Sequence, residues 1–200
     1  MKNEVILENN RVRLVPLKES HIEDLWPIAK LVDIYEYGPN DISTKEKLSQ
    51  YVSSALKSKL ENQAIPFAIL DKKTSKIIGC TRFGQIDLRN KVLHIGWTWI
   101  SPEAQGTGLN QQMKFLMLTY AFEILQMDKV EFRIDERNVK SRKAVEKLGA
   151  TLEGILRKNV FVKNNFKRST CCYGILEENW QEIKETIFKD YSTDFAGEAL

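Results

Sequence analysis

The sequence is poor in the residues that build disulfide frameworks and metal sites. It has 3 cysteines and 2 histidines, His21 and His94, among 200 residues. Two of the cysteines, Cys171 and Cys172, are adjacent, so no disulfide framework is expected and a reducing compartment fits best. No spacing of these residue types matches a zinc site or another metal site.

Long apolar runs and a strong net charge are also lacking. We find no signal peptide and no apolar run close to the ~18 residues of a membrane span, so we expect a cytoplasmic protein without membrane contacts. The 30 basic and 27 acidic residues leave a net charge of +3, which by itself gives no reason to expect nucleic-acid binding. We find no linker and no internal repeat in the sequence. We therefore predict one domain over residues 1–190 and a frayed tail over residues 191–200.

The periodic patterns predict an α/β (α+β) fold, with an antiparallel meander first and a βαβ unit afterwards. Strands are expected at residues 11–17, 65–70, 76–86, 92–100, 130–134, 152–162 and 166–176. Helices are expected after Ser20, after Ser43 or Thr44, and at residues 110–126, 138–148 and 178–188. Pro27 should kink or divide the first helix. Gly149 should end the fourth, and residues 163–165 should form a hairpin turn.

One stretch, Ile95–Asn110, combines a strand, a short glycine turn and the start of a helix. Glycines let consecutive backbone N–H groups converge, and a helix start adds unpaired donors, so the stretch predicts a site for a phosphate-bearing ligand. A P-loop is excluded because no lysine and hydroxyl residue follow Gly108. A dinucleotide fingerprint is excluded because Gln111 stands where a third small residue is needed. A tight turn without a ligand stays an alternative.

Several short motifs occur in a fixed order after this strand: Gln105-Gly-Thr-Gly108, Asn138-Val-Lys-Ser141, Lys147-Leu-Gly149 and Leu152-Glu-Gly154. Together they resemble the GCN5-related N-acetyltransferase (GNAT) superfamily, and within it the RimJ/RimL-like branch that acetylates ribosomal-protein N-termini. The resemblance covers essentially the whole chain. It implies the GNAT fold, a mixed and mostly antiparallel twisted sheet flanked by helices. It also implies acetyl-CoA as co-substrate, and suggests a homodimer.

The resemblance further implies which residues bind acetyl-CoA. The pyrophosphate would lie on the backbone of the turn, made by Gln105, Gly106, Thr107, Gly108, Leu109 and Asn110, the last standing where the family commonly has glycine or alanine. The pantetheine arm would pair with the backbone of Trp99 and Ile100. Asn138 would bind a pantetheine amide and Ser141 would face the sulfur and stabilise the departing thiolate. Helix capping is the alternative role for Asn138 and Ser141.

The catalytic residues are less well specified. The family's glutamate base corresponds to His94, six residues before Ile100, and a histidine with a pKa near ~6.5 suits proton transfer at neutral pH; a purely structural hydrogen bond is the alternative. Valines, Val145 and Val160, occupy the positions of the family's tyrosine acid and of the ribosomal branch's glutamate. Tyr173 and Glu153 are the remaining acid candidates.

The acceptor should be a primary amine. An α-amine, with a pKa near ~7.8, is neutral far more often at pH 7.4 than a lysine with a pKa near ~10.4, so it needs less help from a base. A protein N-terminal α-amine is therefore the leading acceptor, and a small amine is the alternative within the enzyme class. A CoA-binding module without turnover and a nucleotide-binding α/β protein also stay open. The acceptor site should lie between the first two helices and the last hairpin, where Trp26, Tyr35, Tyr37 and Phe161 are available.

Overall fold

The computed structural model describes residues 5–31 and 36–191. In it, eight strands form one sheet in the order β1-β2-β3-β4-β5-β6-β8-β7, and only β5 and β6 are parallel neighbours. The strands are β1 (Leu7–Glu8), β2 (Val12–Pro16), β3 (Ile65–Asp71), β4 (Lys76–Asp87), β5 (Val92–Ile100), β6 (Lys129–Asp135), β7 (Thr151–Val162) and β8 (Phe166–Leu176). The α/β class and the meander followed by a βαβ unit are confirmed.

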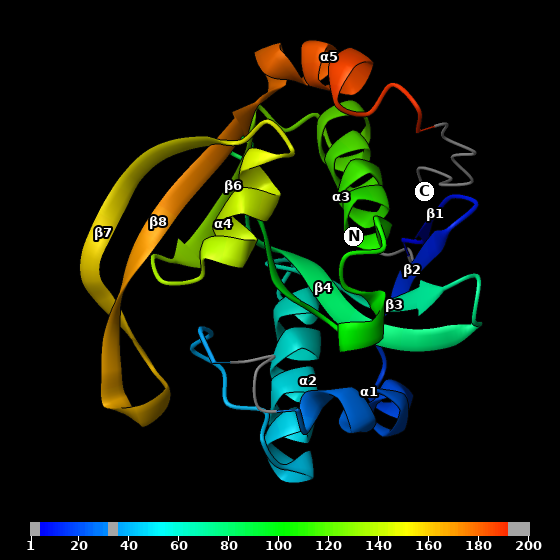
Figure 1. Cartoon of the computed structure of the whole chain (residues 1–200), viewed down its shortest axis with the longest axis vertical. Coiled ribbons are helices and arrows are strands. Elements are labelled where there is room, and N and C mark those ends of the chain that lie inside the picture. The colour runs from blue at the N-terminus through cyan, green and yellow to red at the C-terminus, as the bar shows by residue number, and fades with distance from the viewer. Residues whose placement is uncertain (1–4, 32–35, 192–200) are drawn as a thin grey trace.

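Helices cover both faces of the sheet (Figure 1). They are α1 (Ile22–Ala29), α2 (Lys45–Leu60), α3 (Leu109–Thr119), α4 (Val139–Glu146) and α5 (Glu177–Thr186), and α3 continues into a π-helical turn over Tyr120–Ile124. The smaller apolar core lies between the sheet and α1 and α2. The larger core includes buried residues of α3, α4 and α5. The sheet therefore has two packed faces, and β5 contributes side chains to both.

The structure overturns the cap predicted at Ser20 for the first helix, and of the two outcomes predicted for Pro27, a kink or a division, it excludes the division. Ser20 does not cap the helix, because a 3₁₀ turn over Glu19–His21 comes first, with Lys18 at its N-terminal cap. Pro27 does not divide the helix, since α1 continues to Ala29 with Pro27 inside it. A proline in a helix interior removes one backbone hydrogen bond. Here Leu25, Ile28 and Ala29 are buried in the smaller core, which holds the last turn in place.

The other end signals act as expected. Thr44, rather than Ser43, caps α2, with its Oγ1 accepting the Lys47 N–H at 3.2 Å. Gly149 has φ +91°, and its N–H and that of Ala150 donate to the carbonyls of Glu146 and Val145 at 3.0 and 3.2 Å. This is the pattern in which a left-handed glycine ends a helix.

The hairpin between β7 and β8 also follows its prediction. It turns at residues 163–165, where Asn164 and Asn165 have φ +58° and +57°. Asparagine tolerates this left-handed region better than most residues. The two strands form a long curved ribbon at one end of the sheet (Figure 1).

Some predictions fall on residues outside the described ranges. They concern Tyr35 in the loop before Pro39, and residues 192–200 of the expected tail. The division into a domain over 1–190 and a tail stays a prediction. Within residues 5–31 and 36–191, no helix has both the length and the apolar composition needed to cross a membrane.

Candidate active site

The sheet opens between β5 and β6. These strands pair only from Val92 to His94 on β5 and from Lys129 to Glu131 on β6. Beyond that point β5 continues to Ile100 along β4, while β6 continues along β8. In the described part of the chain, the β6-facing edge of residues 95–100 therefore has no strand partner. An unpaired edge of this kind is a template for an extended ligand.

A bulge in β5 lies along this open edge. The pairing with β4 shifts so that Trp97 and Thr98 stand opposite the single residue Thr81, and Trp97 has φ +50°. Positive φ is uncommon for a residue with a side chain, and bulges next to active sites re-aim side chains. Here the bulge turns the Trp97 ring against Gly84, where a Cβ would come within 2.4 Å of the ring.

The register decides which backbone groups face the opening. The Ser101 N–H donates to the Ile78 carbonyl at 2.7 Å, so by antiparallel alternation the polar groups of Trp99 face β4 and those of Ile100 face away from it. The Ile100 carbonyl accepts a bond from the Gln105 Nε2 at 3.2 Å. Of the two residues predicted to pair with pantetheine, the structure thus turns Ile100 toward the open edge and Trp99 toward β4.

The glycine turn follows directly. Gly106 and Gly108 have φ +75° and +81°, and a Cβ on either would meet no atom within 4 Å. Gly108 is the N-terminal cap of α3, and its carbonyl accepts from Gln111 and Gln112. Among the described residues, no acceptor is found for the backbone N–H groups of residues 106–110. These donors and the positive end of the α3 dipole suit an anion.

The start of α4 faces this turn. The Lys140 Nζ donates to the Gln105 Oε1, which joins α4 to the turn. Asn138 caps α4, and its Oδ1 accepts the Ser141 N–H at 3.0 Å. In the described part of the chain, neither the Asn138 Nδ2 nor the Ser141 hydroxyl has a hydrogen-bond partner. Capping uses the Oδ1 of Asn138 and the backbone N–H of Ser141. The Asn138 Nδ2 and the Ser141 Oγ therefore stay available to a ligand.

His94 lies where β5 and β6 separate. It is buried, and its Nε2 accepts the Arg133 backbone N–H at 3.2 Å, while its Nδ1 has no partner. Burial, and secondarily the charge of Arg133, lowers the pKa of His94 to about 4. The expected pKa near ~6.5 is therefore wrong for this site, and in this geometry the ring has no free lone pair with which to accept a proton.

Tyr173 is fully buried on β8 beneath α4. Its hydroxyl donates to the Glu146 Oε1 at 2.6 Å and accepts from the Arg142 Nε at 3.1 Å. Burial and the bond to Glu146 raise the pKa of Tyr173. Glu153, the other acid candidate, binds the Lys129 Nζ at 2.8 Å. Both candidates have intramolecular partners.

Two charged residues near the opening were missed from the sequence. Lys114 of α3 is buried, and its Nζ donates to the Thr98 Oγ1 on the open part of β5 at 2.9 Å. Burial lowers the pKa of Lys114 to about 7. Arg82 of β4 is buried beside Trp97. Two features of the sequence could have indicated that these residues are buried. Lys114 stands between the apolar residues Met113 and Phe115, and Arg82 stands inside an apolar strand.

The structure brings together some of the residues predicted to frame the acceptor site. The Arg168 side chain of β8 donates to the Tyr37 carbonyl at 2.8 Å, which ties the segment before α2 to the last hairpin. Trp26 packs against the smaller core, and Phe161 is exposed on β7. Tyr35 lies outside the described residues.

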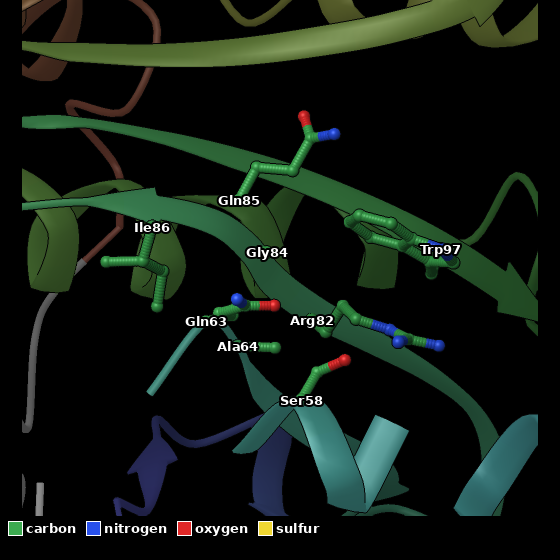
Figure 2. A pocket seen from close by; sticks show the side chains of 8 residues that line it. All are labelled: Ser58, Gln63, Ala64, Arg82, Gly84, Gln85, Ile86 and Trp97. Atoms are coloured by element: carbon green, nitrogen blue, oxygen red, sulfur yellow. The ribbon is translucent and has the colours of Figure 1, made fainter. Parts of the chain in front are cut away.

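A cavity of about 380 Å³ lies on the α2 side of β4. Figure 2 shows the side chains around it, with Arg82 running alongside the Trp97 ring. It is lined by Ser58, Gln63, Ala64, Arg82, Gly84, Gln85, Ile86 and Trp97. Trp97 belongs both to this cavity and to the open part of β5, so the two features are adjacent.

Comparison with known proteins agrees with this geometry. A family model described as an acetyltransferase (GNAT) domain matches residues 11–151, which is most of the chain. The chain belongs to the GNAT acetyltransferase family. This GNAT protein is 28% identical over 117 residues to the uncharacterized N-acetyltransferase p20 of Bacillus licheniformis, covering 58% of the chain and 64% of that relative.

Two further curated relatives carry functional names. The relative named "Putative ribosomal N-acetyltransferase YdaF", from Bacillus subtilis, is 30% identical over 108 residues, or 54% of this chain and 58% of its own length. The spermidine N(1)-acetyltransferase of Escherichia coli K12 is 33% identical over 70 residues, or 35% of this chain and 38% of its own. The chain thus spans less than two thirds of the length of these relatives.

Solved structures match nearly the whole chain. A GCN5-related N-acetyltransferase from Brucella melitensis has a TM-score of 0.82 at 25% identity, covering 96% of this chain and 90% of that one. The microcin C7 self-immunity acetyltransferase MccE, solved with acetyl-CoA and AMP, has a TM-score of 0.74 at 20% identity, covering 84% and 93%. The expected GNAT fold is confirmed.

The residues of this chain fit acetyl-CoA. The unpaired N–H groups of residues 106–110 suit its pyrophosphate, and the open edge at Ile100 suits its pantetheine arm. GNAT proteins use this co-substrate, which MccE was solved with. In the described ranges, no group of three or more His, Cys, Asp or Glu side chains is arranged to hold a metal ion.

Proposed function

We propose that this GNAT protein is an acetyl-CoA-dependent N-acetyltransferase that acetylates a primary amine by direct attack. The observation that carries the proposal is the unpaired edge of β5 running into the glycine turn before α3. A turn that binds no ligand would not explain why the backbone N–H groups of residues 106–110 have no acceptor in the described part of the chain. The open edge of β5 suits the pantetheine arm of CoA, and the turn suits its pyrophosphate.

In this proposal each part of the opening has a role. Residues 105–110 hold the pyrophosphate through backbone N–H groups, and the backbone of Ile100 and the Asn138 Nδ2 hold the pantetheine arm. The Ser141 hydroxyl faces the sulfur. Acetyl-CoA supplies the thioester that the amine attacks. Donors placed at a departing thiolate stabilise the charge that develops there.

The acceptor in this proposal is an α-amine. The neutral His94 ring has its Nε2 engaged by Arg133, so the described site offers no free histidine base, and an amine that is already partly neutral at pH 7 reacts with the least assistance. A protein N-terminus, as in the RimJ/RimL-like branch, is the first candidate. The similarity to the relative named "Putative ribosomal N-acetyltransferase YdaF" supports it.

A small-molecule amine is the second candidate, and the cavity beside Trp97 favours it. About 380 Å³ is within the usual range of small-ligand pockets. The spermidine acetyltransferase relative points to polyamines, but a buried arginine in the cavity wall would repel a polycation. The cavity therefore favours a small amine that is not itself polycationic.

Thermal unfolding with acetyl-CoA, together with a thiol-release assay, tests the proposal. At 100 times its dissociation constant the ligand should add about 2.7 kcal/mol to the free energy of unfolding. The amine panel should include N-terminal peptides, amino acids, aminoglycosides and polyamines. Stabilisation with thiol release on an α-amine is the expected result. Stabilisation without turnover on any amine would favour a CoA-binding module, and no stabilisation would overturn the proposal.

A further inference from the structure

Arg82 is a buried cation held between aromatic rings. Its side chain comes from the middle of β4, and the residue is 6% exposed. The guanidinium carbon lies 4.9 Å from the centre of the Tyr51 ring of α2 and 4.7 Å from that of Trp97. In Figure 2 the Arg82 side chain runs below the Trp97 ring, and Ser58 of α2 lies below Arg82.

Among the described residues, no carboxylate pairs with this guanidinium. Across residues 5–31 and 36–191, Arg82 forms no ion pair, and its polar neighbour is the Tyr51 hydroxyl. The fully buried side-chain nitrogens without a hydrogen-bond partner in the described residues do not include those of Arg82, so its charged end reaches the cavity that it lines. The cation–π contacts with Tyr51 and Trp97 hold the guanidinium in place and contribute about 1 to 2 kcal/mol each. The guanidinium therefore presents an unpaired positive charge to the cavity.

The cavity gives an anion a place to bind. Arg82 forms part of its wall, and Ser58 and Gln63 add polar side chains, whereas the Gln85 side chain points away from Arg82 (Figure 2). A planar guanidinium binds a carboxylate or a phosphate through two parallel hydrogen bonds. Hydroxyl and amide groups around it can complete the shell of such an anion. The ligand chemistry that this wall recognises is thus an acidic group.

Trp97 links the cavity to the reaction site. Its backbone forms the bulge in the open part of β5, while its ring covers both Gly84 and Arg82. An acceptor that brings its amine to the open edge would therefore place its remaining atoms against the Trp97 ring and Arg82. The Arg82 guanidinium would therefore contact the rest of the acceptor and not its amine.

We propose that the cavity beside Trp97 is an anion subsite of the acceptor, so that the acceptor is a primary amine that also carries a carboxylate or a phosphate, bound by Arg82. This inference rests on the proposed acetyltransferase function and names its substrate class. The acidic group can belong to a free amino acid or to an acidic residue of an N-terminal peptide. The chemistry recognised by Arg82 is the same in both.

The test uses the full-length protein and acceptors that differ in one acidic group. The pairs are alanine and alaninamide, glutamate α-amide and glutamine α-amide, phosphoserine α-amide and serine α-amide, and C-terminally amidated tripeptides whose second residue is glutamate or glutamine. With the wild-type protein, kcat/KM should be about 10- to 100-fold higher for the acidic member. Preference in the amino-acid pairs alone indicates a free acceptor, and preference in the peptide pairs indicates a protein N-terminus.

Variants of Arg82 locate that preference. Arg82→Met should abolish it, and Arg82→Lys should keep part of it, while both keep their stabilisation by acetyl-CoA. Arg89→Met is the matched control, because it removes an equal charge from an exposed turn and should leave the preference unchanged. A wild-type enzyme that acetylates amines without regard to the acidic group would overturn this inference alone. The wild-type comparison decides even where an Arg82 variant does not fold. Absence of stabilisation by acetyl-CoA would instead overturn the proposed function.

Discussion

Lys114 and His94 are the two titratable side chains of the opening whose pKa values burial lowers most, to about 7 and about 4. Both values lie below those of the unfolded chain, so the unfolded state binds more protons and stability rises with pH over each interval. Near neutral pH His94 is unprotonated and Lys114 is close to its midpoint. At neutral pH, His94 and Lys114 together therefore carry less positive charge than an exposed histidine and an exposed lysine would.

Replacing Lys114 with methionine should change how stability depends on pH. In the wild-type protein, the free energy of unfolding should rise by up to about 5 kcal/mol between pH 7 and 10.5, because the folded state has released a proton that the unfolded chain keeps. Lys114→Met should lack this rise and be more stable at pH 7. Urea unfolding at several pH values measures both. Below pH 6, the difference between the two proteins should be constant, and equal slopes above pH 7 would contradict the assignment.

His94→Gln should reduce the loss of stability in acid. Between about pH 6.5 and 4 the wild-type protein should lose up to about 3 kcal/mol, since the unfolded histidine is protonated while the buried one is not. A glutamine oxygen can still accept the Arg133 N–H, so the variant should fold and keep most of its stability at pH 7. Denaturant unfolding from pH 7 to pH 4 measures the difference.

The same variant separates structure from catalysis. With acetyl transfer to an α-amine, the pH profiles of kcat/KM for His94→Gln and wild type should have the same shape between pH 6 and 9, because the acceptor amine sets it. If the variant loses an ascending limb centred near pH 6.5, His94 acts as a base and its bond to Arg133 opens during turnover.

At the scale of elements, the glycine turn and the first turn of α3 act as one unit. Gly108 is in the left-handed region and faces open space, so a side chain there strains the backbone without a clash. Alanine or glutamate at Gly108 should therefore cost about 1 to 2 kcal/mol of stability. The effect on ligand binding should depend on charge.

Gly108→Glu should abolish most of the stabilisation by acetyl-CoA, because its carboxylate lies beside the donors that meet the pyrophosphate. Gly108→Ala is the matched control, with the same strain and no charge, and should keep most of that stabilisation. Thermal unfolding with and without the ligand compares them. Equal ligand affinity in both variants would show that the phosphates bind elsewhere.

At the scale of the whole molecule, the acceptor side joins segments far apart in the sequence. Arg168 of β8 is 8% exposed and donates to the Tyr37 carbonyl at 2.8 Å and to the Thr170 hydroxyl at 3.3 Å. Arg137 lies between the same two parts, with its guanidinium carbon 5.5 Å from the centre of the Tyr37 ring and 3.9 Å from that of Phe166. These contacts hold the segment before α2 against the final hairpin.

Arg168→Met should release that segment. Hydrogen exchange at residues 36–40 should become faster, and KM for the acceptor should rise about 10-fold, the effect of losing one charged hydrogen bond. Stabilisation by acetyl-CoA should not change, because residues 105–110 are untouched. Arg157→Met, on the exposed face of β7, is the control. A rise in the dissociation constant of acetyl-CoA would contradict this division of the site.

Local chemistry let the sequence alone determine most of the framework. Thr44 at a helix start, Gly149 at a helix end and the asparagines of the last hairpin act through their nearest backbone neighbours, so each could be read from its position. The glycine turn at residues 105–110 belongs to the same class. The cap predicted at Ser20 was wrong because Lys18 takes that position before a 3₁₀ turn. Pro27 does not divide α1, since Leu25, Ile28 and Ala29 around it pack in the smaller core.

Only the tertiary structure decided the chemistry of individual side chains. The pKa of His94, the burial of Lys114 and the aromatic surroundings of Arg82 depend on residues from several strands and helices. A pKa follows burial and nearby charge, and neither is a property of a short stretch of sequence. Likewise, the sequence placed Trp99 and Ile100 together on the open edge, but the register of β5 on β4 turned only Ile100 outward, because alternation along a strand is set by its partner.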